Sequence, residues 1–480
     1  MKRLLVVYDD SIKPNKEVGA ITGHNSYGDT IFKRITLKNR TKAEILKNKA
    51  VVDVLFYSGP EDKEQLYKAC KSLEEPVNLV HLYSNFALKD TKEFSVLLTK
   101  AQYAKESFVA LCQEKTAMAI INGGEEYFSH FEDLVSRTFE GEHIITDAFM
   151  DISKRSNFLT FITSGFDARF FNALLGDEYT VTKRSNKKEK IKSEYNFYYL
   201  LPDNMKMWFV MPFDYKEEPE FASYTMERYH MTDIAIRFVH GAVSVEELSD
   251  ILEKLFYFIR LRGKKEASAK EVKAVAKELY VDKLKSRMEE LKKYSQYEQF
   301  NHLLAMGTKY ESIEQVMETY FGLYEKIKRQ EKDNGCLVIG HGDLCFSNIL
   351  YSREAGLLKL IDPKGALKEE ELYTDLYYDL AKLSHSICGC YDFFNSGLYE
   401  ITMDRDMKLS LTIDTDREPY VEIFKSYLKE NDFDYRLVRL YEASLFLSML
   451  PYHMDQPGKV FGFILNAINI LDEVEECIQE

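Results

Sequence analysis

The 480-residue sequence has no surplus of basic residues, few cysteines and no amino-terminal segment shaped like a signal peptide. Its 64 Lys and Arg residues are outnumbered by 78 Asp and Glu residues, which gives a net charge of -14. Because binding to nucleic-acid phosphates requires basic surface, this balance argues against broad nucleic-acid binding and leaves room only for a local basic groove. The first apolar run, LLVVYDD, is too short to span a bilayer and ends in two acids. We therefore expect a cytoplasmic protein without membrane insertion.

The seven cysteines are scattered, and none stands in a CxxC pair. Neither a disulfide framework nor a zinc site is therefore indicated. The closest pair, Cys388 and Cys390, fits a metal or redox site, but reduced core thiols are the commoner explanation. Internal repeats and low-complexity tracts are also absent, whereas 32 Tyr and 31 Phe supply abundant core material. This composition indicates a folded chain with two or three domains.

The first 150 or so residues alternate strand-like and helix-like segments. The strand-like runs are LLVVYDD, VVDVLFYSG, VNLVHLYSN and AMAIINGG, at residues 4–10, 51–59, 77–85 and 117–124. Segments with helical spacing of apolar residues lie between and after them. Because β/α units of this kind build a mainly parallel sheet, we predict an α/β domain of unassigned role over residues 1–152.

The pattern changes near Ser153. Five strand-like runs follow, FLTFITSG, RFFNALLG, EYTVTKRS, MWFVMPFDY and EFASYTMERY, with the helical segment KKEKIKSEYNFYYLL after the third. They predict a small antiparallel sheet over residues 153–231. From Thr232 onward helical spacing dominates, so residues 232–480 are predicted to be mostly helical to the end. The Lys-rich stretch GKKEASAKEVK fits a solvated helix start better than a basic binding site.

One apolar stretch of this helical part keeps three polar side chains. The run VIGHGDLCFSNIL, residues 338–350, contains His341, Asp343 and Asn348, and the run LLKLI then leads to Asp362. Phosphoryl transfer from ATP requires a carboxylate that orients the attacking hydroxyl, together with oxygen ligands for Mg²⁺. These residues supply that set of groups. A chance match to four fixed positions arises in roughly one protein in several hundred.

The pattern H-G-D-x4-N, followed by a hydrophobic strand that ends in Asp, resembles the kinase-like phosphotransferases, which include aminoglycoside phosphotransferases and choline kinases. It is matched by His341-Gly342-Asp343, Asn348 and Leu360-Ile361-Asp362. The resemblance implies that Asp343 is the catalytic base, that Asn348 and Asp362 hold Mg²⁺, and that His341 braces the loop. It covers roughly Asn157 to the carboxyl terminus. It implies a bilobal, kinase-like α+β fold, with a small antiparallel-sheet lobe and a mostly helical lobe, after the α/β domain.

In this superfamily a Lys on the third strand contacts the ATP phosphates and pairs with a Glu on the following helix. EYTVTKRS offers Lys183, and Glu194 is the favoured partner, with Glu189 as a competitor. Strand alternation favours an inward-facing Lys183, although a solvated surface lysine is the alternative. Further basic residues crowd this region: Arg184, Lys187, Lys188, Lys190 and Lys192.

The resemblance also implies the rest of the ATP site. A phosphate-covering loop is expected around Ser164 and Gly165, but it lacks the several glycines of protein kinases, and a plain β-turn fits equally well. The backbone of Met226, Glu227 and Arg228, which links the two lobes, is expected to receive the adenine.

Two features follow Asp362. The next residues are Pro363-Lys364-Gly365 instead of Phe-Gly, so the activation-loop switch of protein kinases is not expected. Asp375 or Asp379 is expected to hydrogen-bond the catalytic loop, with an exposed helix acid as the alternative.

The runs LCFSNIL and LIDPKG also resemble phosphotransferase domains of bacterial capsule and surface-polysaccharide biosynthesis.

The first domain offers weaker candidates. Asp9 and Asp10, at the end of a strand, fit a metal site, but DxDxT and GxGxR signatures are absent, so helix capping is the favoured role. Asn122-Gly123-Gly124 follows another strand, where open sheets bind ligands. A turn that requires positive φ explains these glycines equally well.

The sequence therefore predicts an ATP- and Mg²⁺-dependent phosphotransferase that acts on a hydroxyl of a small polar acceptor, such as a sugar, polyol or amino alcohol. One alternative is a catalytically silent nucleotide-binding scaffold or regulator, although the retained Asp343, Asn348 and Asp362 argue against silence. Another is a bifunctional enzyme with an active amino-terminal domain. The acceptor's identity and the oligomeric state are left open.

Overall fold

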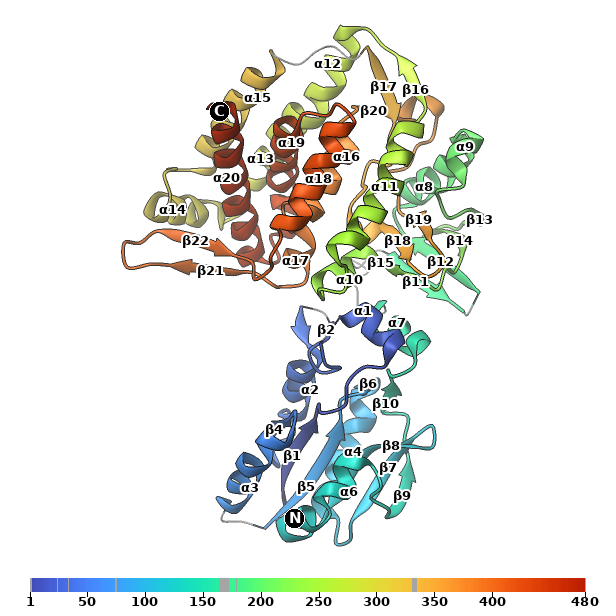
Figure 1. The fold of residues 1–480 in the computed structure, drawn as a ribbon, viewed down its shortest axis with the longest axis vertical. Coiled ribbons are helices and arrows are strands. Elements are labelled where there is room, and N and C mark those ends of the chain that lie inside the picture. Colours follow the sequence, from blue (N-terminus) through green and yellow to red (C-terminus); the bar gives the residue numbers. More distant parts are fainter. Residues whose placement is uncertain are drawn as a thin grey trace. The chain divides into compact units, whose positions relative to one another are not determined.

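The structure is a computed structural model, and it describes residues 2–23, 25–32, 34–73, 76–163, 172–177, 179–329 and 335–479. The chain divides into two compact units (Figure 1). The first comprises Met1–Asp167 together with Arg237–Ala242, and the second comprises Ala168–Ile236 and Val243–Glu480. The domain boundaries after residues 152 and 231 stay predictions.

A six-stranded sheet, in the order β4-β1-β5-β8-β7-β9, forms the centre of the first unit (Figure 1). Leu4 and Val6 of β1 enter one apolar cluster, and Leu5 and Val7 enter a second one. Because β1 is buried on both faces, its sequence is a continuous apolar run. The strands are β1 (Arg3–Asp9), β4 (Val51–Tyr57), β5 (Val77–Tyr83), β7 (Phe108–Cys112), β8 (Lys115–Ile121) and β9 (Glu142–Ile145), with the short strands β2 (Ile31–Phe32), β3 (Ile35–Thr36), β6 (Phe86–Leu88) and β10 (Phe149–Asp151).

The helices of this unit follow the predicted spacing, but the sheet is more mixed than predicted. β1 is parallel to β4 and β5, whereas β8 is antiparallel to both β5 and β7. Gln113 and Glu114, which connect β7 to β8, have φ values of 49° and 66°, as in a type I′ hairpin turn. The helices are α1 (Lys16–Thr22), α2 (Leu37–Ile45), α3 (Lys63–Lys71), α4 (Thr91–Tyr103), α5 (Gly124–Ser129), α6 (Phe131–Ser136) and α7 (Arg155–Thr163), with a 3₁₀ turn at Pro60–Asp62.

The prediction that FLTFITSG forms a strand is wrong, because its first six residues belong to α7. Phe158 and Ile162 are both buried, and their spacing of four residues places them on one face of a helix. The aromatic and β-branched residues that suggested a strand are therefore the buried face of α7.

The small sheet of the second unit has four antiparallel strands instead of the five predicted, in the order β11-β12-β14-β13. Helix α8 follows β12, as predicted, and packs Ile191 and Tyr195 against Ala222 and Tyr224 of β14. The elements are β11 (Asn172–Gly176), β12 (Thr180–Ser185), α8 (Lys188–Leu200), α9 (Asp203–Lys206), β13 (Pro212–Glu217) and β14 (Ala222–Glu227).

The rest of the second unit is mostly helical, so the predicted order of a small antiparallel-sheet lobe followed by a mostly helical lobe is confirmed. Ser268 caps α12 through a capping box with Glu271, which confirms a helix start in the Lys-rich stretch. The helices are α10 (Ile234–Val239), α11 (Val245–Leu261), α12 (Ala269–Lys277), α13 (Lys283–Leu291), α14 (Tyr297–Gly307), α15 (Ile313–Lys328), α16 (Tyr378–Ile387), α17 (Tyr391–Asn395), α18 (Glu418–Glu430), α19 (Tyr435–Ser448) and α20 (Pro457–Gln479), with a π-helical segment at Glu278–Asp282 and 3₁₀ turns at Phe346–Asn348, Glu369–Leu372 and Leu450–His453.

Short strands interrupt this helical lobe. One sheet has the order β15-β18-β19, and a second has the order β16-β17-β20. A hairpin of β21 and β22 corrects the prediction of helices to the end of the chain. The strands are β15 (Thr232–Asp233), β16 (Lys264–Glu266), β17 (Cys336–Ile339), β18 (Ile349–Ser352), β19 (Leu357–Leu360), β20 (Tyr373–Thr374), β21 (Glu400–Met403) and β22 (Leu409–Thr412).

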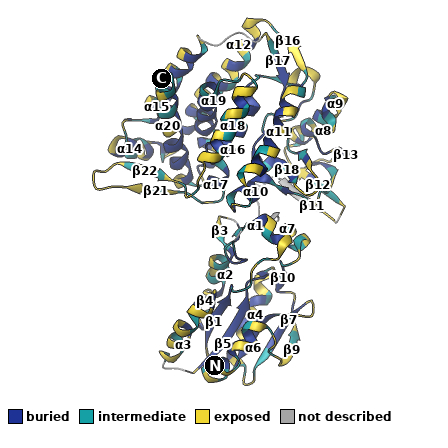
Figure 2. Cartoon of the chain, in the orientation of Figure 1, coloured by how far each residue is buried: buried dark blue, intermediate teal, exposed yellow. Residues whose placement is uncertain are grey.

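Helices α19 and α20 supply much of the core of this lobe, and both are largely buried in Figure 2. Cys388 and Cys390 are buried free thiols, and the described residues contain no cluster of three or more His, Cys, Asp or Glu side chains suited to a metal. Within the described part of the chain, no helix has the length and apolar character needed to cross a membrane.

We expect the difference in stability between Asp392→Asn and the wild type to depend on pH. Burial raises the pKa of Asp392 to about 6, and the Asp392 Oδ2 atom has no hydrogen-bond partner among the described residues. This pKa exceeds the value of ~3.9 for an unfolded chain. The contribution of the Asp392 side chain to the stability of the wild-type protein is therefore fully present below pH ~4, and it is lost as the pH rises through about 6. The variant should therefore gain on the order of 2–3 kcal/mol relative to the wild type between pH 4 and 8.

Calorimetric unfolding of both proteins across this pH range measures the effect. Burial also raises the pKa of Asp233 to about 7, and the charge of Asp392 adds to this effect, so part of the difference between the two proteins arises through Asp233. A constant difference in stability from pH 4 to 8 would show that Asp392 ionises normally in the folded state.

Candidate active site

The motif residues 341–348 form a loop between β17 and β18. His341 is fully buried, and its Nε2 donates to the carbonyl of Ile361 at 2.9 Å, while its Nδ1 accepts from the backbone N–H of Asp343 at 3.2 Å. Burial lowers the pKa of His341, which keeps the ring neutral and able to both donate and accept. Gly342 has a φ of 79°, and a Cβ there would lie 2.6 Å from that of Lys364. His341 therefore joins the loop to the segment that follows β19.

Of the two candidate loop-bracing acids, Asp379 contacts the loop. Its carboxylate accepts the backbone N–H groups of His341 and Gly342 at 3.0 and 2.9 Å. Arg262 donates to the same carboxylate at 3.2 Å, and both side chains are fully buried. Asp375 instead accepts from the hydroxyl of Tyr280 at 2.9 Å. The start of α16 thus fixes the backbone of the loop.

Asp343 presents a half-exposed carboxylate with two nitrogen donors, and the thiol of Cys345 lies 3.9 Å from its Oδ1. Lys382 Nζ lies 2.9 Å from Asp343 Oδ1, and Asn348 Nδ2 lies 3.1 Å from Oδ2. Burial acts to raise the pKa of Asp343, but the charge and hydrogen bond of Lys382 outweigh it and lower the pKa. The carboxylate is therefore ionised at neutral pH, and its remaining lone pairs can accept a hydroxyl proton.

Asn348 and Asp362 flank one end of the β18–β19 hairpin. The backbone N–H of Ile361 donates to the carbonyl of Asn348 at 3.0 Å, which extends the hairpin ladder by one bond. Asp362 has a φ of 54°, an uncommon conformation that Asp adopts more readily than most residues. The local backbone therefore holds both side chains at the same end of the hairpin.

The oxygens of these two residues fit a Mg²⁺ site. Asn348 Nδ2 donates to Asp343, which leaves Asn348 Oδ1 without a partner in the part of the chain that is described. Asp362 Oδ1 accepts from Lys183, while Asp362 Oδ2 has no such donor among the described residues. Mg²⁺ is commonly held by one or two protein carboxylates, with phosphates and water completing its shell. Two oxygen ligands without a larger acidic cluster agree with this pattern.

Lys183 lies inward and is almost fully buried. Its Nζ is 2.7 Å from Glu194 Oε2 and 2.9 Å from Asp362 Oδ1. Burial alone lowers the pKa of Lys183, but the charges of Asp362 and Glu194 raise it above its usual value. Tyr224 also donates to Glu194 Oε2, at 3.1 Å. Lys183 thus connects α8 to the segment that carries Asp362, and its partner is Glu194 instead of Glu189.

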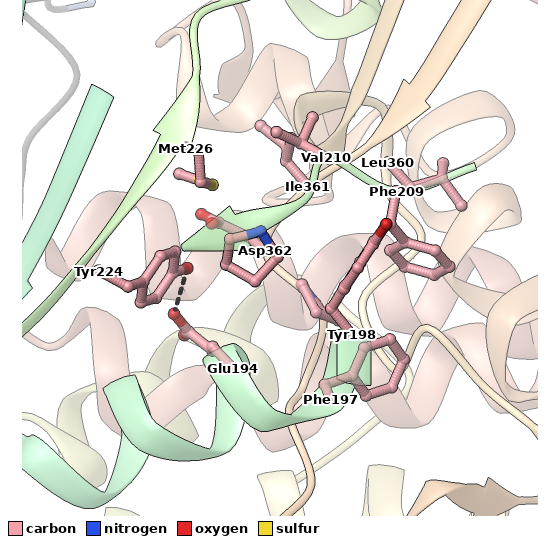
Figure 3. Close-up of a pocket in the computed structure, with 12 residues that line it drawn as sticks. Glu194, Phe197, Tyr198, Phe209, Val210, Tyr224, Met226, Leu360, Ile361 and Asp362 are labelled. Carbon is pink, nitrogen blue, oxygen red and sulfur yellow. Dashed lines mark hydrogen bonds between the residues drawn. The ribbon is translucent and has the colours of Figure 1, made fainter. Parts of the chain in front are cut away.

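A small hollow lined mostly by apolar side chains lies next to this cluster. Figure 3 shows it between α8, β14 and the segment that leads to Asp362, with the hydrogen bond from Tyr224 to Glu194 at one edge. Its lining includes Phe197, Val210, Met226 and Ile361. A hollow of this kind, bordered by two carboxylates, has the apolar walls and few polar groups typical of small-molecule sites.

The three residues that were expected to bind adenine, Met226, Glu227 and Arg228, differ in their contacts. Met226 lines the hollow, and Glu227 is the last residue of β14. The backbone N–H of Arg228 donates to the carbonyl of Tyr179 at 2.8 Å, so this group is already in use. Binding of adenine by Met226, Glu227 and Arg228 stays a prediction. The proposed phosphate-covering residues Ser164 and Gly165 lie outside the described residues.

In the first unit, the prediction that Asp9 or Asp10 caps a helix is wrong, because Asn15 is the residue that caps α1. Asp9 forms a buried pair with His81 at 3.1 Å, and Asp10 accepts the backbone N–H of Gly28 at 2.9 Å. Both acids therefore have hydrogen-bond partners at or just after the end of β1. The turn interpretation is supported at Gly123, which precedes α5 with a φ of 104°.

Sequence reasoning missed Lys382. It lies on α16, three residues after Asp379, so both side chains project from the same face of the helix. That spacing in YYDLAKLSHS was the available signal, because any helix that brings Asp379 to the loop also brings Lys382 close to it.

Lys183→Ala should lower kcat/KM for ATP by about 10²- to 10³-fold, if Lys183 contacts the phosphates as the resemblance implies. Both a higher KM and a lower kcat are expected, because a cation stabilises bound phosphate and the charge of the transition state. Steady-state kinetics at varied ATP concentration measure both. Lys192→Ala is the control, because Lys192 is an exposed lysine on α8, the helix that follows the strand with Lys183. The assignment is wrong if Lys192→Ala causes this loss and Lys183→Ala does not.

Comparison with known proteins gives structural neighbours only. No protein-family model matches the chain, and no curated protein matches it. It is similar to the aminoglycoside phosphotransferase APH(4)-Ia, with 10% identity and a TM-score of 0.35 over 66% of this chain and 99% of that one. A thermostable APH(4)-Ia variant with AMP-PNP and hygromycin B has 10% identity and a TM-score of 0.38, over 65% and 97% of the two chains. APH(3'')-Id from Streptomyces rimosus, with ADP and streptomycin, has 14% identity and a TM-score of 0.32, over 62% and 97%.

Proposed function

We propose that the second unit transfers a phosphoryl group from Mg²⁺·ATP to a hydroxyl of a small polar acceptor, such as a sugar, polyol or amino alcohol. The observation that carries this proposal is the double contact of Lys183, which lies within 2.9 Å of both Glu194 and Asp362. Asp343 and Asn348 stand on the adjoining loop, hydrogen-bonded to each other. A phosphate-binding cation, metal ligands and a base are thereby gathered at one site.

Each group has a role in this reaction. Lys183 would bind phosphate oxygens, with Glu194 holding its ammonium in place. Asn348 and Asp362 would hold Mg²⁺, which when bound neutralises charge on the β- and γ-phosphates. Asp343 would accept a hydrogen bond from the acceptor hydroxyl and orient its oxygen toward the γ-phosphate. His341 and Asp379 act indirectly, because they fix the backbone that carries Asp343.

ATP consumption tests this proposal. The full chain would be incubated with Mg²⁺·ATP and a pooled panel of sugars, polyols, amino alcohols and nucleosides, and ADP release would be compared with and without the pool. We expect release that depends on the acceptor pool. Tight binding of Mg²⁺·ATP without any turnover on the pool or on cell extract would instead favour a silent nucleotide-binding scaffold. A role in surface-polysaccharide biosynthesis stays a prediction from the sequence resemblance.

A fragment spanning Ser153–Glu480 should bind Mg²⁺·ATP with an affinity close to that of the full chain. All the proposed ATP-site residues that are described belong to the second unit. Calorimetric titration of both proteins measures the affinities. A lower rate of phosphoryl transfer to the acceptor in the fragment agrees with this prediction, because a fused domain often contributes to a substrate site. A folded fragment that binds no nucleotide would show that the first unit forms part of the ATP site.

A further inference from the structure

Lys382 occupies an unusual place beside the proposed base. Its Nζ lies 2.9 Å from Asp343 Oδ1, while the side chain is only 13% exposed. Helix α16, which carries Lys382, is held to the same loop through Asp379, whose carboxylate accepts two backbone N–H groups there. The two hydrogen bonds to Asp379 therefore help to set the position of the ammonium relative to Asp343.

The hydrogen bonds of this ammonium are incomplete. A lysine ammonium has three N–H donors, and Asp343 Oδ1 is its one acceptor among the described residues. Lys183 differs, because Glu194 and Asp362 both accept from it. The ammonium therefore has donors available for an anionic group bound beside Asp343.

The charges around Lys382 keep it protonated. Burial acts to lower the pKa of Lys382, but Asp343 outweighs this effect and raises the pKa above its usual value. The site thus offers a permanent positive charge next to the carboxylate that would orient the acceptor. Charge stabilisation of this kind is most effective where it is fixed in place before the reaction.

We propose that Lys382 directly contacts the phosphoryl group during transfer, as a second phosphate-binding cation on the acceptor side of the site. This inference rests on the proposed phosphotransferase function. The acceptor oxygen forms a bond to the γ-phosphorus, and the bond from that phosphorus to the β–γ bridging oxygen breaks. The bond's electron pair leaves with ADP, and the acceptor's proton passes to Asp343 and then to water. Lys382 keeps its proton throughout and stabilises negative charge on the phosphoryl oxygens.

The rival role is purely indirect, with Lys382 serving only to hold the carboxylate of Asp343. A double-mutant cycle separates the two roles. If Lys382 acts only through Asp343, its removal has no further effect once Asp343→Asn has been introduced. If Lys382 contacts the phosphoryl group, its removal slows the reaction again in that background.

The experiment measures single-turnover ATP cleavage with the acceptor pool for the full chain and for Lys382→Met, Asp343→Asn and the double variant. We expect Lys382→Met to lose about 10²-fold or more in rate while its Mg²⁺·ADP affinity and melting temperature stay near the wild-type values. The double variant should be at least about tenfold slower than Asp343→Asn, and Lys382→Arg should recover part of the rate. Lys283→Met is the matched control, because Lys283 donates to the hydroxyl of Tyr378 of the same helix at 3.3 Å and, among the described residues, does not contact Asp343.

Two results overturn the inference in an active enzyme. One is a double variant as fast as Asp343→Asn, and the other is a Lys382→Met protein with wild-type turnover. Because the double variant removes both charges of the pair, it keeps the test decisive even if Lys382→Met alone does not fold. Absence of turnover in the wild-type chain would instead count against the proposed function itself.

Discussion

Asp343→Asn should lower kcat by about 10²- to 10⁴-fold while leaving Mg²⁺·ATP affinity and folding nearly unchanged. An amide cannot accept the acceptor's proton, and it offers one oxygen where the carboxylate offers two. Asn is close to Asp in size, and its remaining oxygen can still accept from Lys382, whose side chain is 13% exposed, so we expect little change in folding. Steady-state kinetics and calorimetric titration of Mg²⁺·ATP separate the effect on kcat from the effect on binding.

Asp203→Asn is the control for this substitution. Asp203 is an exposed carboxylate 2.8 Å from Lys206, so the variant also breaks a lysine–aspartate contact but does so away from the loop. We expect it to retain wild-type kinetics. Wild-type turnover in Asp343→Asn, or an equal loss in Asp203→Asn, would contradict the role of Asp343 as the base.

Asp362→Asn should weaken Mg²⁺·ATP binding by about tenfold to a hundredfold, which corresponds to losing ~1.5–3 kcal/mol of a charged interaction. An Asn side chain keeps one oxygen but removes the charge that attracts both the metal and Lys183. Asn is preferred to Ala for this test, because residue 362 has a φ of 54° and Asn tolerates this conformation well. Titration of Mg²⁺·ATP at fixed ionic strength measures the effect.

The matched control is Asp214→Asn. Asp214 also has a positive φ, 51°, and its carboxylate lies 2.8 Å from Lys216. The two variants therefore share the same backbone conformation and the same type of ion pair. If Asp362→Asn binds Mg²⁺·ATP as tightly as Asp214→Asn does, then Asp362 is not the metal ligand.

The parts of the site that could be predicted are those with a local signature. The spacing from His341 to Asn348 lies within a single loop, and Asp362 follows one hairpin later. Lys183 lies 179 residues before Asp362, and it was selected through the superfamily resemblance with the support of strand alternation, while Glu194 was favoured as its partner and Glu189 stayed open. Functional residues that lie within one short segment can be recognised from the sequence, because a short segment has few conformations that bring its residues together.

Lys382 could not be selected in this way. Its contact with Asp343 depends on how α16 docks against the loop, and that docking depends on Asp379 and the buried Arg262. Arg262 belongs to a segment more than a hundred residues earlier in the chain. The three-residue spacing from Asp379 to Lys382 is therefore informative only once it is known that Asp379 contacts the loop.

The errors in the fold have local physical causes. The segment with Phe158 and Ile162 has strand-forming residue types, but their burial on one helical face decided its structure. The β7–β8 hairpin turns at Gln113 and Glu114, which lack the Asn-Gly signature of a type I′ turn. In both cases packing by distant parts of the chain overrode the local preference.

The most direct measurement of the central claim is the mass of the product formed when the full chain is incubated with Mg²⁺·ATP and a metabolite extract. The account predicts a metabolite that gains the mass of one HPO₃ group, in amounts that match the ADP released, and that is not formed by Asp343→Asn above the residual rate. Formation of the same product at the same rate by Asp343→Asn, or neither ATP consumption nor Mg²⁺·ATP binding by the wild-type chain, would contradict it.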